Sequence, residues 1–142
     1  MSKHFFVAAA TFLFFVSFVS AQCKSYTKKY CFPSLAPYTH NGQFNGAILM
    51  PGEVAEMNIT FSSGKEYRLL VCSHETIGQS FFKVLDEKRN ELYNSEGKNK
   101  NYWDFKVENT QQLIIQINVP YKKPLNNILP SGCVSVLIGF TH

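Results

Sequence analysis

The chain lacks most of the residue spacings on which metal sites and hydrolases are built. It contains four cysteines and four histidines, but no pair has the C-x-x-C spacing typical of zinc sites. It has neither the G-x-S-x-G motif of serine hydrolases nor the D-x-D-x-D-G start of a calcium loop. The sequence therefore predicts no metal ion, no cofactor and no catalytic residues.

Clustered positive charge is also missing. The 14 Lys and Arg residues outnumber the 10 Asp and Glu residues, but they occur as separated pairs such as Lys28-Lys29, Lys88-Arg89 and Lys122-Lys123. Domains that bind nucleic acids usually present a clustered basic face. The charge pattern therefore predicts a solvated surface and no nucleic-acid partner.

Only the first residues form a long hydrophobic run. Phe5 to Val19 is apolar at all but two positions, and these 15 residues fall short of the ~20 that a membrane-spanning helix needs. A short basic start precedes the run and the small residues Val19-Ser20-Ala21 end it, as in a signal peptide. We expect residues 1–21 to be cleaved. Residues 22–142 would then form one exported domain without a transmembrane segment, in the periplasm, at the outer surface or outside the cell.

Export would place Cys23, Cys31, Cys72 and Cys133 where disulfides form. An even number of cysteines favours two disulfides, for which three pairings are possible. Cys72 and Cys133 both lie in strand-like segments, and we expect them to pair, with Cys23–Cys31 closing a short N-terminal loop. This pairing depends on the shape of the loop: if the segment is helical, eight residues of helix separate its two cysteines by ~12 Å, which is too far for a disulfide.

The rest of the chain alternates apolar and polar residues with the period of a β-strand. Lys24 to Phe32 is predicted to form one or two helical turns, which Pro33 and Pro37 end. Beyond them, the inward sides of the clearest strands are predicted to be Ala55, Met57, Ile59 and Phe61, then Leu113, Ile115, Ile117 and Val119. Turns separate about eight such segments, and 120–130 is a long irregular connection. The pattern predicts a mainly β fold, an antiparallel, jelly-roll-like β-sandwich of about eight strands with a short N-terminal helix.

Several short phrases resemble a family of small exported proteins of Gram-negative bacteria that has no assigned activity. They are Ala36-Pro37-Tyr38, Gly64-Lys65-Glu66-Tyr67-Arg68, Trp103-Asp104-Phe105, Thr110-Gln111-Gln112-Leu113-Ile114-Ile115 and Ser131-Gly132-Cys133-Val134. More loosely, the order of a G-x-x-Y strand, a D-x-x-x-x-x-L hairpin and a W-x-F strand is similar to pre-peptidase C-terminal β-sandwich modules. Both resemblances imply an exported β-sandwich, and neither implies catalytic residues.

Two tyrosines are the candidate ligand-binding residues. Tyr102 follows the polar loop 98–101 and alternates with Trp103, which shares a face with Phe105 and is predicted to be in the core. Tyr102 is then expected to point outward, and with Tyr93 it could stack on sugar rings. A weaker alternative is a hydrolase that uses His74 with Glu75, although neighbouring side chains on a strand point to opposite faces.

Taken together, these patterns favour an exported, non-enzymatic protein-interaction or structural module, whose partner is a protein or a glycan of the cell envelope. The alternative is a polysaccharide-binding module built on Tyr93 and Tyr102. No sequence pattern decides between these two hypotheses.

Overall fold

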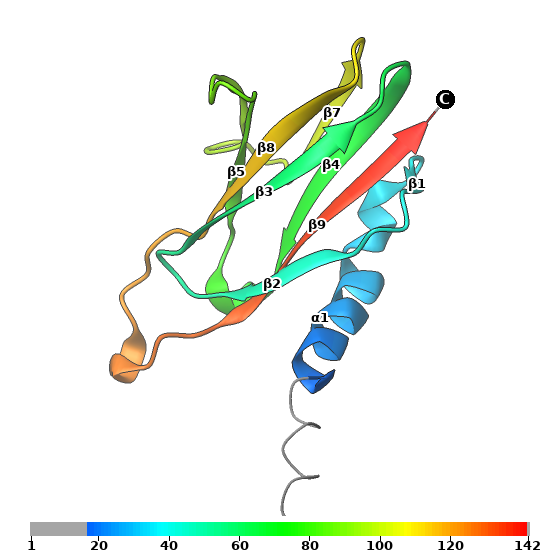
Figure 1. Cartoon of the computed structure of the whole chain (residues 1–142). Coiled ribbons are helices and arrows are strands. Elements are labelled where there is room, and N and C mark those ends of the chain that lie inside the picture. The colour runs from blue at the N-terminus through cyan, green and yellow to red at the C-terminus, as the bar shows by residue number, and fades with distance from the viewer. Residues whose placement is uncertain (1–16, 142) are drawn as a thin grey trace, which may run out of the picture.

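The computed structural model describes residues 17–141, with side chains from Gln22 onward, and the predicted signal peptide lies largely outside this range. The described chain contains one α-helix and nine strands (Figure 1). The helical segments are α1 Ser17–Tyr30 and the 3₁₀ helices η1 Phe32–Leu35, η2 Glu75–Ile77 and η3 Leu125–Asn127. The strands are β1 Thr39–His40, β2 Asn45–Leu49, β3 Val54–Phe61, β4 Lys65–Ser73, β5 Phe81–Leu85, β6 Glu91–Asn94, β7 Tyr102–Val107, β8 Gln111–Asn118 and β9 Gly132–Thr141.

The strands form two antiparallel sheets packed face to face, which confirms the predicted β-sandwich (Figure 1). Sheet A has the order β1-β9-β4-β7, and β2 continues the β1 edge by pairing with β9. Sheet B has the order β3-β8-β5-β6. The count within the described residues exceeds the expected eight by one, because the two-residue strand β1 has no alternation that the sequence could reveal.

The core between the sheets is built from the side chains that the alternation assigned to it. On β3, Ile59 and Phe61 are buried, and Ala55 and Met57 pack against them. The inward-facing apolar residues of β8, which pairs with β3 in sheet B, belong to the same cluster. Burial of each large aliphatic or aromatic side chain contributes about 1.5–3 kcal/mol, so this cluster dominates the stability of the sandwich.

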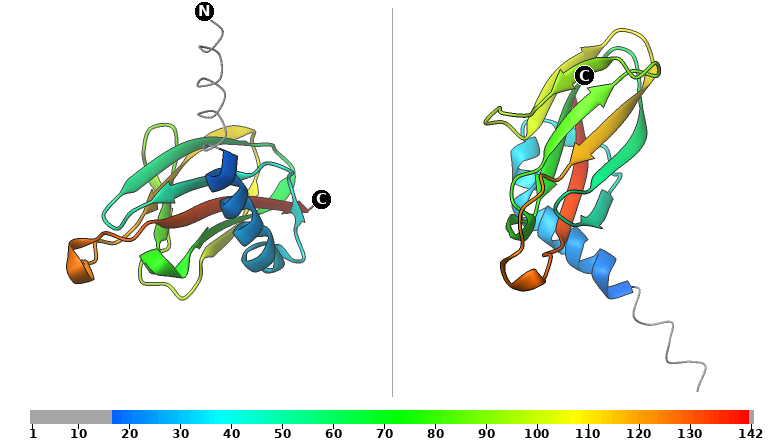
Figure 2. Two further views of the ribbon diagram at one scale, coloured as in Figure 1. Left: turned by 90° about the horizontal axis from the view of Figure 1, so that it is seen from below. Right: turned by 90° about the vertical axis from the view of Figure 1, so that its left-hand side faces the viewer.

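A second, smaller core lies on the outer face of sheet A, where α1 and η1 cover β9 and β4 (Figure 2). Cys31 and Leu35 pack there against Leu70 and Leu137. Strand β9 is therefore buried on both faces over most of its length. This explains why its sequence is almost continuously apolar rather than alternating.

The segment that follows η1 crosses β9 very closely. A Cβ atom at Gly139 would lie only 2.7 Å from Cβ of Tyr38 and 3.2 Å from Cδ2 of Leu35. Only glycine permits this approach of backbone to side chain. The crossing holds the N-terminal segment against sheet A.

The four cysteines form two disulfides, but the expected pairing is wrong. Cys23 is bonded to Cys133 and Cys31 to Cys72. The reason is the length of α1, which extends from Ser17 to Tyr30 and holds Cys23 and Cys31 more than two turns apart. Each disulfide therefore joins the N-terminal segment to a strand of sheet A. Together they fasten α1 and η1 onto the sandwich.

Candidate functional site

The two tyrosines predicted to bind ligand lie in different surroundings. The Tyr93 ring stacks on Trp103, with centroids 4.9 Å apart and planes 12° apart, and Lys98 Nζ lies 4.3 Å from its centroid. Burial, with a smaller effect of Tyr102, raises the pKa of Tyr93. Tyr102 instead packs against the second core, and the guanidinium of Arg68 lies 4.1 Å from its ring centroid. The two rings thus form no common flat platform.

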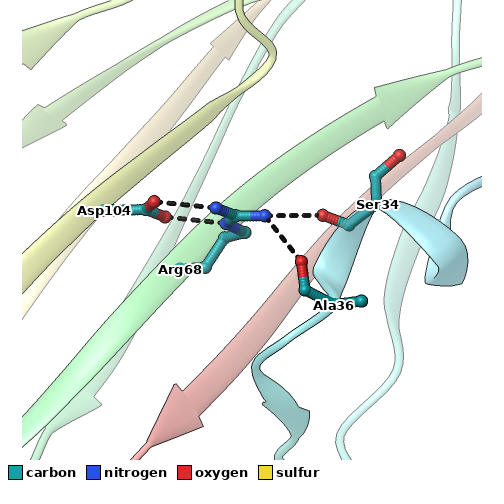
Figure 3. Close-up of polar contacts among 4 residues, drawn as sticks. All are labelled: Ser34, Ala36, Arg68 and Asp104. Carbon is teal, nitrogen blue, oxygen red and sulfur yellow. Dashed lines mark hydrogen bonds and ion pairs between the residues drawn. The ribbon is translucent and has the colours of Figure 1, made fainter.

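Arg68 joins three of the phrases that the sequence analysis singled out (Figure 3). Its Nε and Nη2 donate to the two carboxylate oxygens of Asp104 at 2.7 and 2.8 Å, and its Nη1 donates to the carbonyls of Ser34 and Ala36 at 3.0 and 3.1 Å. The guanidinium also lies 4.8 Å from the Tyr38 ring. With its donors occupied in this way, Arg68 acts as a structural clamp and offers little to a ligand.

His74 of the hydrolase alternative and Ser73, which precedes it in the chain, bind different groups. Ser73 Oγ donates to the carbonyl of Gly78 at 3.3 Å. His74 Nδ1 accepts from the backbone N–H of Thr76 at 3.1 Å and caps η2. Within residues 17–141, no hydrogen bond joins Ser73 to His74, and no group of three or more His, Cys, Asp or Glu is placed to hold a metal ion.

No helix of the described range has the length and apolarity needed to cross a membrane.

Exposed apolar side chains gather instead at one end of the sandwich, which we call the apolar end. It is formed by the β2–β3 turn and the long β8–β9 loop, and this loop projects beyond the strands (Figure 2). Three loop side chains are largely exposed, with exposed fractions of 71% for Tyr121, 86% for Leu125 and 75% for Ile128. The remaining exposed members are Met50, Val54 and Leu129.

Local hydrogen bonds explain how the two segments come together. The backbone N–H of Gly52 donates to the carbonyl of Val119 at 2.8 Å, and that of Val119 donates to the carbonyl of Glu53 at 3.0 Å. Gly52 has φ +90°, a left-handed conformation that favours glycine. The Tyr121 ring comes within 3.5 Å of the position that a Cβ would take at Gly52. The root of the β8–β9 loop is therefore anchored to the β2–β3 turn.

The tip of the loop has its own backbone signature. Asn126 and Asn127 both have positive φ, 65° and 58°, which asparagine tolerates better than most residues. They turn the chain at η3 and leave Leu125 and Ile128 on the outside. A loop with apolar side chains on the outside gains nothing for folding, so their exposure suggests a role in binding.

The charge at the apolar end is positive. Lys122 and Lys123 lie in the loop, and 119–131 contains no Asp or Glu. The nearby Glu53 carboxylate accepts the backbone N–H of Met50 at 2.8 Å. The apolar end thus combines hydrophobic side chains with two lysines.

Sequence reasoning treated 120–130 as an irregular connection and missed this surface. One signal of an exposed apolar loop was present in the sequence. The segment 120–130 has no strand alternation, yet it contains large apolar residues together with three prolines and two asparagines. A loop of this kind cannot place its apolar residues in the core by alternation. It therefore leaves them exposed or packs them irregularly.

Comparisons with known proteins give a fold but no family. No protein-family model and no curated protein sequence matches the chain. The solved structure of PliG from Aeromonas hydrophila, a periplasmic lysozyme inhibitor of g-type lysozyme, is similar with a TM-score of 0.50 and 7% sequence identity. The likeness covers 74% of this chain and 89% of that one. PliG from Salmonella Typhimurium gives a TM-score of 0.41 with 10% identity, over 70% of this chain and 86% of that one.

Proposed function

We propose that this chain is an exported, non-enzymatic protein-binding module that contacts its partner through the apolar end. The observation that carries the proposal is the exposure of Tyr121, Leu125 and Ile128 on a loop that projects from a disulfide-linked sandwich. Large apolar side chains in water are costly, and their burial against a partner is the main source of affinity in interfaces.

The anchoring of the loop supports the same role. Its root is held by backbone hydrogen bonds to the β2–β3 turn. Because the root is already ordered in the free protein, binding costs less conformational entropy. Because the loop is convex, its partner is expected to offer a concave surface. Lys122 and Lys123 favour acidic groups on that surface.

As the partner we propose an enzyme of the lysozyme class. Two arguments support it: the fold is similar to that of a periplasmic lysozyme inhibitor, and glycoside hydrolases carry paired carboxylates in a cleft. A convex, apolar and basic loop is complementary to such a cleft in shape, polarity and charge. The two disulfides suit an oxidising compartment such as the periplasm, where the partner would be met.

Inhibition assays test this proposal. We expect the purified chain to slow the lysis of a cell-wall suspension by g-type lysozyme. L125D/I128D should abolish the effect, because two carboxylates in the loop oppose both burial and binding to an acidic cleft. L92D places one such carboxylate at an exposed leucine of β6, outside the apolar end, and should inhibit like the wild type.

Two results would overturn the proposal. One is unchanged lysis by g-type lysozyme at every ratio of the two proteins. The other is a dimer of the chain that L125D/I128D converts to monomer in sedimentation, because the apolar end would then be covered by a second copy.

Export from the cytosol is part of this proposed function. We propose that a signal peptide is removed after Ala21, so that the mature chain starts at Gln22, one residue before the Cys23–Cys133 disulfide. The mass of the chain secreted by its host checks this. A chain that retains residues 1–21 would contradict it.

A further inference from the structure

A polar groove lies beside the root of the β8–β9 loop. It consists of two adjoining hollows of about 420 and 340 Å³ that share Gln79, Ser80 and Asn99 in their lining. The first continues to Asn101 and the second to Phe81 and Pro120. Volumes of this size lie within the range of ~300–1,000 Å³ typical of small-molecule sites.

Hydrogen bonds fix both walls of the groove. On one side, Ser80 Oγ donates to Ser73 Oγ at 3.1 Å, and Ser73 Oγ donates to the carbonyl of Gly78 at 3.3 Å. On the other side, the backbone N–H of Val71 donates to the carbonyl of Asn101 at 2.9 Å, and that of Ser95 to the carbonyl of Phe82 at 2.9 Å. The groove is therefore formed before any ligand binds, which lowers the cost of binding.

The amide side chains in the groove make no hydrogen bonds within residues 17–141. Gln79, Asn99 and Asn101 are exposed, and each amide offers two donors and an acceptor. By contrast, the amides of Asn41, Asn90 and Asn94 form turns or hold neighbouring residues. Three available amides along one groove provide donors and acceptors for a ligand that has both.

The other lining groups narrow the ligand class. Glu75 and Glu96 are balanced by Lys98 and Lys100, so the groove has no excess charge that would select an anion or a cation. Phe81 is half-buried and supplies an aromatic surface. A ligand that suits this lining is neutral, carries many hydroxyl groups and has an apolar face.

We propose that this groove binds a neutral oligosaccharide, with Asn99 and Asn101 as hydrogen-bonding residues and Phe81 as the surface that contacts a sugar ring. Pyranose rings with equatorial hydroxyl groups meet each requirement, because their edges hydrogen-bond and their faces present C–H groups. This proposal differs from the one built on Tyr93 and Tyr102, since neither tyrosine lines the groove. It is also independent of lysozyme binding, which uses the loop side chains.

NMR titration of the full mature chain tests the proposal, with cellopentaose and N-acetylchitopentaose as the two probes. Binding of either sugar, with the largest shift changes at Gln79, Asn99 and Asn101, supports it, and the two arms show whether an acetamido group contributes. N99A/N101A should weaken binding about tenfold, as expected for the loss of two hydrogen bonds. F81A should weaken it as well.

Matched controls keep the result clear. N58A/Q112A removes two amides from the outer face of sheet B and should leave the dissociation constant unchanged. Thermal unfolding of each variant shows whether it folds. The proposal is overturned if neither sugar shifts the groove signals, or if N99A/N101A is folded and binds as well as the wild type.

Discussion

Arg68 and Asp104 lie directly opposite each other on β4 and β7 and form an ion pair with two hydrogen bonds. The same guanidinium donates to carbonyl groups of the segment that follows α1. One side chain therefore connects the edge of sheet A with the N-terminal segment. The hydrogen bond to Asp104 is the largest contribution to the raised pKa of Arg68.

Arg68→Lys should lower the free energy of unfolding by about 2 kcal/mol, because lysine keeps the charge but cannot bind both carboxylate oxygens and the two carbonyls. Urea unfolding with the disulfides intact measures this. Arg89→Lys is the matched control, since Arg89 pairs with Glu56 at an exposed site, where a lysine keeps the charge and solvent screens the pair. Equal midpoints for the two variants would show that Arg68 is not a clamp.

The strands could be predicted from the sequence because one face of each sheet meets the core. The alternation on β3 and β8 places inward the same side chains that the structure buries or packs against the core. The disulfide pairing could not be predicted, because it depends on how far α1 extends and where it packs. The apolar end was missed for a related reason, since no local pattern shows which way a loop without alternation directs Leu125 and Ile128.

Disulfide mapping checks the corrected pairing. Lys24, Lys28 and Lys29 lie between Cys23 and Cys31, so trypsin separates these two cysteines. We expect the unreduced digest to contain Cys23 linked to Cys133 and Cys31 linked to Cys72. A peptide that links Cys72 to Cys133 would contradict the structure.

Removal of the Cys31–Cys72 bond tests how much it contributes. It joins residues 41 positions apart, and the chain-entropy model gives such a link about 4 kcal/mol. In urea unfolding, the free energy of unfolding of C31A/C72A should be lower than that of the wild type by about this amount. The double variant avoids leaving an unpaired thiol. Addition of a reductant to C31A/C72A controls for the second disulfide, because it should destabilise the variant further.

Glu56 provides a test by pH. Hydrogen bonds from Arg89, and secondarily from Gln116, lower the pKa of Glu56 from 4.5 to about 2. A lowered pKa in the folded state means that the unfolded chain takes up the proton first. The contribution of Glu56 is therefore complete above pH 4.5, declines as the pH falls, and is lost below about pH 2.

An NMR titration of the carboxyl carbons follows this directly, with Glu56 expected to titrate near pH 2. R89A should raise the pKa of Glu56, whereas K88A, which changes the neighbouring charge in the same turn, should leave it close to the wild-type value. A wild-type midpoint near 4.5 would show that the ion pair does not persist in solution.

A buried pair of hydroxyl groups beneath α1 gives the last prediction. Thr27 Oγ1 donates to the carbonyl of Cys23 at 2.7 Å and lies 2.5 Å from Ser135 Oγ on β9. Because the single hydroxyl proton of Thr27 is already used, Ser135 must be the donor in the second bond. T27V then leaves a buried hydroxyl without an acceptor and should cost about 1–3 kcal/mol.

S135A should recover part of this loss when it is combined with T27V, because the double variant has no unsatisfied hydroxyl at this site. The double-mutant cycle is measured by urea unfolding, and T60V, at an exposed position of β3, shows the effect of the same substitution without burial. Strictly additive losses would mean that the two hydroxyl groups do not interact. In that case, the packing of α1 on β9 would depend on the disulfides and the apolar contacts alone.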